Sequence, residues 1–182
     1  MKRLVLCSVL TVVVSLGTQQ PVQAQGMGAV LDFIHKLSGP KMIGPALSVY
    51  TEGERVRGRF TGAWRWSFNS DDKIDPDGSK ITMLSLQPTV EVPLGSSPLD
   101  AVAGFALHRF GGDVKEDFWH WSIPAYLQLR FPKTGRVSVK LAVGGHYFAE
   151  FGATDFDDLV VDVSRTGGEW VWASFAGIDI AF

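Results

Sequence analysis

The residues best suited to chemistry in this sequence are His120 and Ser122, which stand two positions apart in FWHWSIPAYLQLRF (118–131). In an extended chain, residues two apart share a face, so the imidazole could accept the hydroxyl proton and activate the serine as a nucleophile. Such a pair needs an acid that orients the imidazole, and no carboxylate stands at a spacing that completes the set. His120 and Ser122 are therefore weak catalytic candidates, and the simpler interpretation is that they are polar residues of a strand with no catalytic role.

Two acidic stretches invite comparison with metal sites. DDKIDPDGSK (71–80) holds four aspartates before a glycine, but it lacks the ligand spacing and the closing Glu of a calcium loop. GATDFDD (152–158) is a second turn-like acidic cluster. The histidines stand on separate segments, and no Gly-rich phosphate loop follows a strand. We expect solvated turns here, no metal and no cofactor.

The amino-terminal segment predicts export. Lys2 and Arg3 precede the apolar run Leu4–Leu16, which indicates a signal peptide over 1–24. The run is too short to span a bilayer, which takes about 20 residues. Cys7, the only cysteine, would leave with the signal, so no disulfide or thiol site is expected. Removing the signal lowers the basic count from 17 to 15 against 19 acidic residues, which argues against nucleic-acid binding.

Residues 25–41 predict a short amphipathic helix. Val30, Leu31 and Ile34 fall at helical spacing, and Gly39-Pro40 would end the helix, so we expect it over about 28–38. It would lie on a membrane surface or pack against the end of a sheet.

From position 42 onward the period changes to two. In RVRGRFTGAWRWSFN (55–69) the arginines share one face and the large aromatic residues share the other. Turn-rich separators delimit eight expected strands, at about 42–51, 55–69, 80–94, 101–110, 118–131, 136–151, 158–165 and 169–182. Consecutive antiparallel strands predict an up-and-down β-barrel over 42–182, because closure removes the exposed sheet edges.

A closed barrel has either an apolar interior in water or an apolar exterior in a membrane. Several expected strands have about 14–16 residues, whereas strands of soluble sheets have about five or six. The six tryptophans also share the apolar register, and this strand count places four at one end of the barrel and two at the other. Bands of aromatic residues at both ends are typical of the two membrane interfaces. These residues are Trp64, Trp66, Trp119, Trp121, Trp170 and Trp172.

With the apolar face outward, the polar register lines the lumen. Side chains fill a barrel of eight strands, and buried charges must be paired, so we expect a structural network of ion pairs. The alternative is a narrow polar path for a small solute. The expected lumen residues are Arg55, Arg57, Arg59, Arg65, Glu91, Arg130, Lys140, His146 and Glu150.

The last stretch, EWVWASFAGIDIAF (169–182), carries Ala176, Ile178 and Ile180 in alternation and ends on Phe182. It resembles the final strand of bacterial outer-membrane β-barrel proteins, which ends on an aromatic residue preceded by alternating apolar positions. The resemblance is architectural and identifies no single family. It implies an outer-membrane location, contact with outer-membrane lipid, and recognition of the last strand by the barrel-assembly machinery. One departure is that the long links would lie on the side of the termini, the reverse of these barrels.

The expected function is non-enzymatic: an outer-membrane barrel with a structural or small-solute, porin-like role. Two alternatives come from other classes. One is a periplasmic, lipocalin-like carrier of an apolar ligand. The other is an outer-membrane enzyme that hydrolyses or transfers the acyl chains of lipid A, since some eight-stranded outer-membrane enzymes use a His/Ser arrangement in the barrel wall. The substrate or solute and the oligomeric state stay open.

Overall fold

The computed structural model describes residues 24–35, 41–53, 55–68, 81–112, 117–148 and 170–182. They form nine β-strands: β1 (Ala24–His35), β2 (Lys41–Glu52), β3 (Arg57–Phe68), β4 (Ile81–Pro93), β5 (Leu99–Gly104), β6 (Ala106–Gly112), β7 (Phe118–Phe131), β8 (Val137–Phe148) and β9 (Trp170–Ala181). Within these ranges there is no helix of the length and apolarity that membrane crossing requires.

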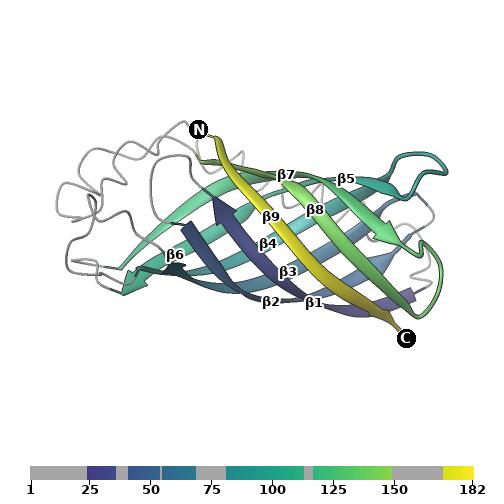
Figure 1. Cartoon of the computed structure of the whole chain (residues 1–182), viewed down its shortest axis with the longest axis horizontal. Coiled ribbons are helices and arrows are strands. Elements are labelled where there is room, and N and C mark those ends of the chain that lie inside the picture. Colours follow the sequence, from purple (N-terminus) through teal and green to yellow (C-terminus); the bar gives the residue numbers. More distant parts are fainter. Residues whose placement is uncertain (1–23, 36–40, 54, 69–80, 113–116, 149–169) are drawn as a thin grey trace, which may run out of the picture.

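The strands close into an antiparallel barrel (Figure 1). β9 pairs back with β1 in a continuous register from Gly26↔Ala181 to His35↔Trp172. β5 and β6 are two halves of one wall strand, because both lie between β4 and β7. The barrel therefore has eight strands in its wall, and the predicted eight-stranded up-and-down barrel is confirmed.

Two prolines explain the break between β5 and β6 at Phe105. The Phe105 N–H donates to the Pro88 carbonyl of β4 at 3.0 Å, but proline has no N–H to return a bond. On the other side, Pro124 of β7 lies between the pairs Ala103↔Ala125 and Ala106↔Ser122, where it removes another donor. The register is the same on both sides of the break, so the wall stays continuous.

The prediction of an amino-terminal helix is wrong for the part of that segment that the structure describes. Residues 24–35 form β1, which pairs with both β2 and β9, and 36–40 lie outside the described residues. The apolar residues of this segment fit a helical spacing and a two-residue period almost equally well. The pairing that closes the barrel is long-range, so the local pattern does not contain it. Residues 1–23 of the expected signal peptide (1–24) and the whole of the expected strand at 158–165 lie outside the described residues.

Because β1 is the first strand of the wall, the turns and loops lie at the opposite ends of the barrel, relative to the C-terminus, from those expected. The short turns 53–56, 94–98 and 132–136 now lie at the same end as the C-terminus, on the right of Figure 1. The segments 36–40, 69–80, 113–117 and 149–169 join strand ends at the opposite end, called here the loop end. The expectation of long links beside the termini is therefore wrong. The two longest connections, 69–80 and 149–169, both lie at the loop end, and short turns with longer outer loops are typical of outer-membrane barrels.

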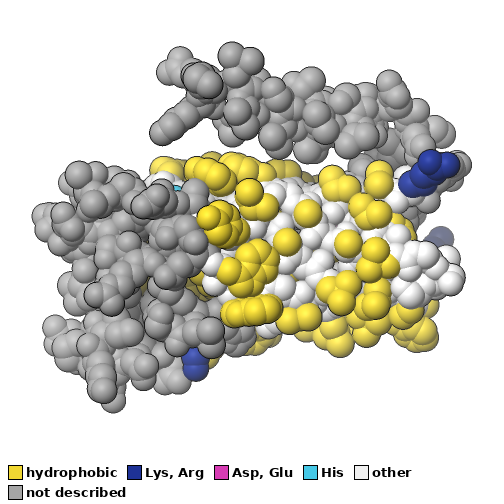
Figure 2. All heavy atoms as spheres, turned by 90° about the horizontal axis from the view of Figure 1, so that it is seen from above, with side chains coloured by type: hydrophobic (Ala, Val, Ile, Leu, Met, Phe, Trp, Pro, Cys, Tyr) yellow, Lys and Arg dark blue, Asp and Glu magenta, His cyan; other side chains and the backbone are white. Residues whose placement is uncertain are grey.

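The two faces of the wall have opposite polarity. Large apolar side chains are exposed on the outside of β1 to β4 and β7 to β9, for example Leu47 (65% exposed) and Val143 (57% exposed), and apolar side chains cover much of the wall in Figure 2. On the face shown there, Lys and Arg side chains appear only at the ends. The interior instead buries charged side chains such as Arg65 and Lys140. The barrel thus has a polar interior and an apolar exterior, as expected.

The interior has layers along the barrel axis. Toward the loop end, Ile34, Met42, Ile81, Phe110 and Phe148 belong to a buried apolar cluster. Hydrogen-bonded imidazole and hydroxyl groups follow, and then charged side chains toward the C-terminal end. The apolar layer accounts for Val171, an inward residue of β9 that a wholly polar lumen would not select.

Candidate functional site in the barrel lumen

Asp179 is the centre of an ion-pair cluster near the C-terminal end of the lumen. Its carboxylate accepts two hydrogen bonds from Arg59, at 3.0 Å to Oδ1 and 2.6 Å to Oδ2, and pairs with Lys140 Nζ at 2.9 Å. Arg57 lies 3.4 Å from the same carboxylate. Glu91 adds a second anion, 2.5 Å from Arg59 Nε. The cluster thus joins β3, β4, β8 and β9 across the lumen.

Several neighbouring groups complete this cluster. The guanidinium carbons of Arg57 and Arg59 lie 4.6 and 4.8 Å from the centre of the Tyr50 ring. Arg59 also donates to Ser48 Oγ at 2.6 Å. A separate pair joins Arg130 to Asp100 at 3.1 Å. These partners satisfy the rule that a buried charge needs a counter-charge and hydrogen bonds.

A second polar element, called here the Ser/His chain, crosses the lumen closer to the loop end. Arg65 pairs with Asp32 and donates to Ser85 Oγ at 2.6 Å. Ser85 Oγ lies 2.7 Å from His108 Nδ1, and His108 Nε2 lies 2.7 Å from Ser122 Oγ.

The Ser/His chain continues beyond Ser122. Ser122 Oγ lies 2.9 Å from His146 Nδ1, and His146 Nε2 lies 2.6 Å from the Tyr126 hydroxyl. Together these residues come from β1, β3, β4, β6, β7 and β8. The Ser/His chain therefore ties six strands together.

Two directions of donation fit the Ser/His chain, because a serine hydroxyl can accept two hydrogen bonds while it donates one. In the direction that starts at Arg65, Ser85 accepts from the guanidinium and donates its own proton to His108 Nδ1. Neutral His108 then carries its proton on Nε2 and donates to Ser122, which in turn donates to His146 Nδ1. His146 likewise carries its proton on Nε2 and donates to Tyr126. The assignment leaves the Tyr126 O–H as the last donor.

This direction limits what the Ser/His chain can do chemically. Proton relay needs groups that both accept and release protons along the whole path, and the guanidinium of Arg65 does not release one. Nucleophilic catalysis by Ser122 would need substrate access, but Ser122, His108 and His146 are all fully buried. The His146 ring is oriented by a tyrosine instead of a carboxylate. The geometry therefore fits a structural network.

The structure rearranges the expected catalytic pair. Ser122 bonds to His108 and His146, whereas the His120 ring stacks on Phe148 with centroids 5.9 Å apart. His120 and Ser122 point to the same side of β7, as the spacing predicts, but no described contact joins them in a nucleophile pair.

Most of the expected lumen residues lie inside the barrel. Buried among them are Arg57, Arg59, Arg65, Glu91, Arg130, Lys140 and His146. Arg55 is an exception, because it lies in the turn between β2 and β3 and is exposed. Glu150 lies outside the described residues.

The sequence reasoning missed several inward residues. Asp32 fell in the expected helix, and His108 stood in a stretch that is apolar on both faces. The available signal was the two-residue period, since His108 alternates with buried Ala106 and Phe110.

The expected interface aromatics all point outward, but their distribution differs from the expectation. Phe182 is 76% exposed, and the exposed fractions of the tryptophans range from 40% for Trp170 to 61% for Trp64. Trp170 pairs with Tyr147 and Trp172 with Gly145, near the loop end of β8. Trp64 and Trp66 end β3 there, and Trp119 and Trp121 begin β7 there.

All six tryptophans therefore lie toward the loop end, and the expected placement of Trp170 and Trp172 at the opposite end is wrong. The cause is again the order of the wall strands: β8 pairs directly and antiparallel with β9, so the strands from β2 to β8 run in the opposite direction, relative to β9, from the one expected. At the C-terminal end the outward aromatics include Phe131 and Phe182.

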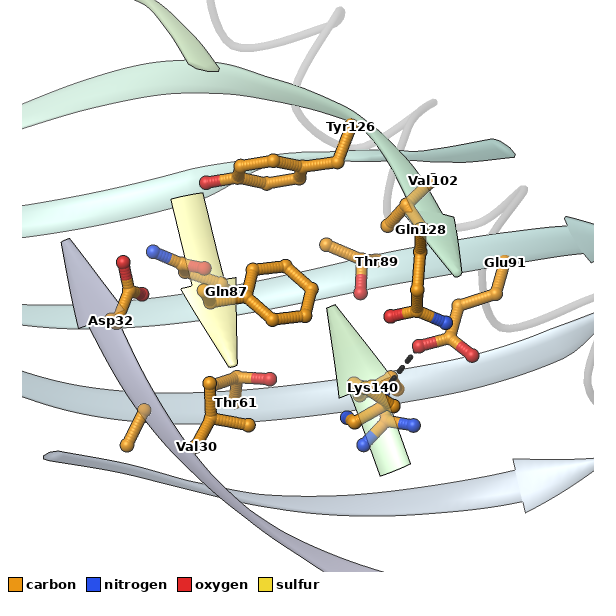
Figure 3. A pocket seen from close by; sticks show the side chains of 13 residues that line it. Val30, Asp32, Thr61, Gln87, Thr89, Glu91, Val102, Tyr126, Gln128 and Lys140 are labelled. Carbon is orange, nitrogen blue, oxygen red and sulfur yellow. Dashed lines mark hydrogen bonds and ion pairs between the residues drawn. The ribbon is translucent and has the colours of Figure 1, made fainter. Parts of the chain in front are cut away.

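A small cavity lies between the Ser/His chain and the ion-pair cluster (Figure 3). Its volume is about 30 Å³, and its lining includes Asp32, Gln87, Tyr126, Gln128 and Lys140. Among the residues that the structure describes, no three His, Cys, Asp or Glu side chains gather in a way that could hold a metal ion.

No family model matches the chain, and no curated protein matches it by sequence. Among solved structures it is similar to Neisserial surface protein A, with a TM-score of 0.58 and 12% identity over 87% of this chain and 96% of that one. It is also similar to the amino-terminal β-barrel domain of Pseudomonas aeruginosa OprF, with a TM-score of 0.51 and 13% identity over 90% and 100%. The chain thus has the fold of the small eight-stranded outer-membrane β-barrel proteins, and no single family of them is identified.

Proposed function

We propose that this protein is a structural barrel of the bacterial outer membrane, with a filled lumen that conducts no solute. The observation that carries the proposal is the polarity of the wall. Apolar side chains cover the exterior of a closed barrel, and charged side chains are buried inside it. Closed barrels satisfy all backbone hydrogen bonds within the wall, which is what a bilayer demands.

Two further features support the outer membrane in particular. The short turns lie at the end of the C-terminus, and the two longest connections, 69–80 and 149–169, join strands at the other end. The tryptophans form a band toward the loop end, at a level where amphipathic rings suit a membrane interface.

The filled lumen favours a structural role over a porin-like one. Toward the C-terminal end, Arg59, Lys140, Glu91 and Asp179 cross the interior as direct ion pairs. Toward the loop end, apolar side chains such as Phe110 and Phe148 are packed together. The cavity between these layers has room for about two water molecules, because one needs at least about 10–15 Å³.

The same features argue against a carrier of apolar ligands. Such a carrier needs an interior cavity that is large and apolar, whereas the lumen cavity described above is small and is lined by Asp32, Glu91 and Lys140 as well as by apolar side chains. We further propose that the barrel-assembly machinery recognises the last strand, whose outward residues Ile178, Ile180 and Phe182 are exposed and apolar.

Fractionation tests the location. The full chain, expressed in a double-membraned bacterium, should be recovered with the outer membrane and should stay there through a carbonate wash. Recovery in the soluble periplasm would contradict the proposal and favour the carrier.

Conductance tests the structural role. The purified barrel, reconstituted in a planar lipid bilayer, should give no discrete conductance steps, while a known porin in the same bilayer does. Reproducible steps from this protein would show that the lumen opens, and the small-solute role would then replace the structural one.

A further inference from the structure

Three polar atoms that face the lumen cavity have no hydrogen-bond partner among the described residues: Asp32 Oδ1, Gln87 Nε2 and Gln128 Oε1. Asp32 and Gln87 are at most 5% exposed, and Gln128 is fully buried. In Figure 3 the Asp32 carboxylate, the Gln87 amide and the Tyr126 hydroxyl lie on one side of the cavity, while Gln128 and Glu91 lie on the other. A buried polar atom without a partner is costly, so these atoms indicate a ligand that satisfies them.

Tyr126 supplies the remaining donor. The Tyr126 hydroxyl lies 2.6 Å from His146 Nε2, and in the direction that starts at Arg65 it accepts the Nε2–H, so its own proton is left to point elsewhere. Tyr126 lines the cavity. The Ser/His chain that begins at Arg65 therefore ends with a donor on the same side of the cavity as Asp32 Oδ1.

The size and charge of the cavity restrict what can bind. A volume of about 30 Å³ accepts about two water molecules and no sugar or acyl chain. Arg59 and Lys140 in the lining disfavour a cation, and Asp32 and Glu91 disfavour an anion. Water both donates and accepts, so it matches the mixed set of one amide donor, one hydroxyl donor and two oxygen acceptors.

We propose that this cavity is a water-binding site, in which water accepts from Tyr126 and Gln87 and donates to Asp32 Oδ1. Because Asp32 also pairs with Arg65, the water closes the Ser/His chain into a ring: Arg65, Ser85, His108, Ser122, His146, Tyr126, water, Asp32 and back to Arg65. Three hydrogen bonds per molecule is the usual count for a buried water.

The ring has one direction, and this makes the proposal testable by spectroscopy. Histidine-selective ¹⁵N NMR on the refolded full barrel in detergent micelles should show His108 and His146 neutral, each protonated on Nε2 and unprotonated on Nδ1. If His146 carries its proton on Nδ1 alone, its Nε2 accepts from the Tyr126 hydroxyl, so this O–H is no longer left for the water and the proposal is overturned. A proton on His108 Nδ1, or a second proton on either imidazole, would break the one-way ring and overturn the proposal as well.

A crystal structure of the same refolded protein tests the water directly. We expect an ordered water within hydrogen-bond distance of both the Tyr126 hydroxyl and Asp32. A dry cavity, or a direct Tyr126–Asp32 hydrogen bond, would overturn the site. Tyr126→Phe should lose this water, whereas Tyr147→Phe, which alters an outward side chain of the neighbouring strand, should keep it. If Tyr126→Phe does not fold, the two measurements on the unmodified protein still decide, and neither depends on the proposed location.

Discussion

Replacing Asp179 by Asn should destabilise the barrel strongly, because Asp179 holds three cations in a buried place. The carboxylate is 1% exposed and lies 2.6 Å from Arg59, 2.9 Å from Lys140 and 3.4 Å from Arg57. In this cluster Glu91 would be the only anion left against three cations. Breaking a buried pair by removing one partner costs about 3–5 kcal/mol. We expect a loss of that size in the free energy of unfolding.

Asp117 provides a matched control for Asp179. It pairs with Arg109 at 2.6 Å, as short as the Asp179–Arg59 contact, but both side chains are nearly half exposed. Exposed pairs contribute about 0–1 kcal/mol, so Asp117→Asn should change little. The two variants remove the same carboxylate charge from a pair of the same length and differ in burial.

The assay is equilibrium unfolding by urea of the barrel refolded into lipid vesicles, followed by tryptophan fluorescence. All six tryptophans lie in the wall, so their emission should report loss of the barrel. A loss for Asp179→Asn within about 1 kcal/mol of that for Asp117→Asn would refute the role of burial. Adding Lys140→Met to Asp179→Asn removes one of the excess cations, and the double variant should lose less than the sum of the two single variants.

Three more predictions concern the wall, the packing of the lumen and the last residue. Leu127→Arg, on the outward face of β7, should lower the free energy of unfolding in vesicles by about 2–4 kcal/mol. Its control, Val137→Arg at the first residue of β8, should lower it by about 0–1 kcal/mol. Equal losses would mean that Leu127 does not face the bilayer core. Gly28→Ala should cost about 1–3 kcal/mol in the same urea assay, since the new Cβ would lie 2.3 Å from Asp179 Oδ1 and 2.6 Å from Ser48 Oγ. Gly62→Ala, with nothing within 4 Å of the new Cβ, is its control, and a harmless Gly28→Ala would contradict the packing described here. Deleting Phe182, which is 76% exposed, should lower the amount of barrel assembled in cells while leaving the unfolding free energy of the refolded protein nearly unchanged; normal assembly would remove its proposed role in recognition.

Local pattern was sufficient for the fold class and for the separation of charged and apolar residues onto opposite faces of the wall. In β3, β7 and β8 the charged and apolar residues alternate, and a two-residue period puts them on opposite faces whatever the neighbouring strands are. Trp64, Trp121 and Leu127 accordingly point outward, and Arg59, Arg130 and Lys140 point inward.

The pattern failed where two periods fit equally well. In β1 the outward residues Met27, Leu31 and Phe33 alternate with Gly28 and Asp32, but the small inward residues hide the alternation. The strand exists because its two edges pair with β2 and β9, and those partners lie far along the chain. Because the expected set of strands did not include β1, it placed Trp170, Trp172 and the long links at the wrong ends of the barrel.

The lumen network depends on register, which no local pattern contains. A shift of one residue in any strand would turn its inward residues out of the lumen. Ser122, His108 and His146 meet because β7 pairs with β6 and β8 in the registers His108↔His120 and Ser122↔Phe148.

From its residue types alone, then, the chain was expected to form a closed barrel with charged and apolar groups on opposite faces, since alternation is a local property. The structure decided which of the two faces is buried. The identity of the first strand, the end that carries the tryptophans and the partners of each buried polar group came from the closed sheet. These depend on hydrogen bonds between strands that are distant in sequence, such as β1 and β9.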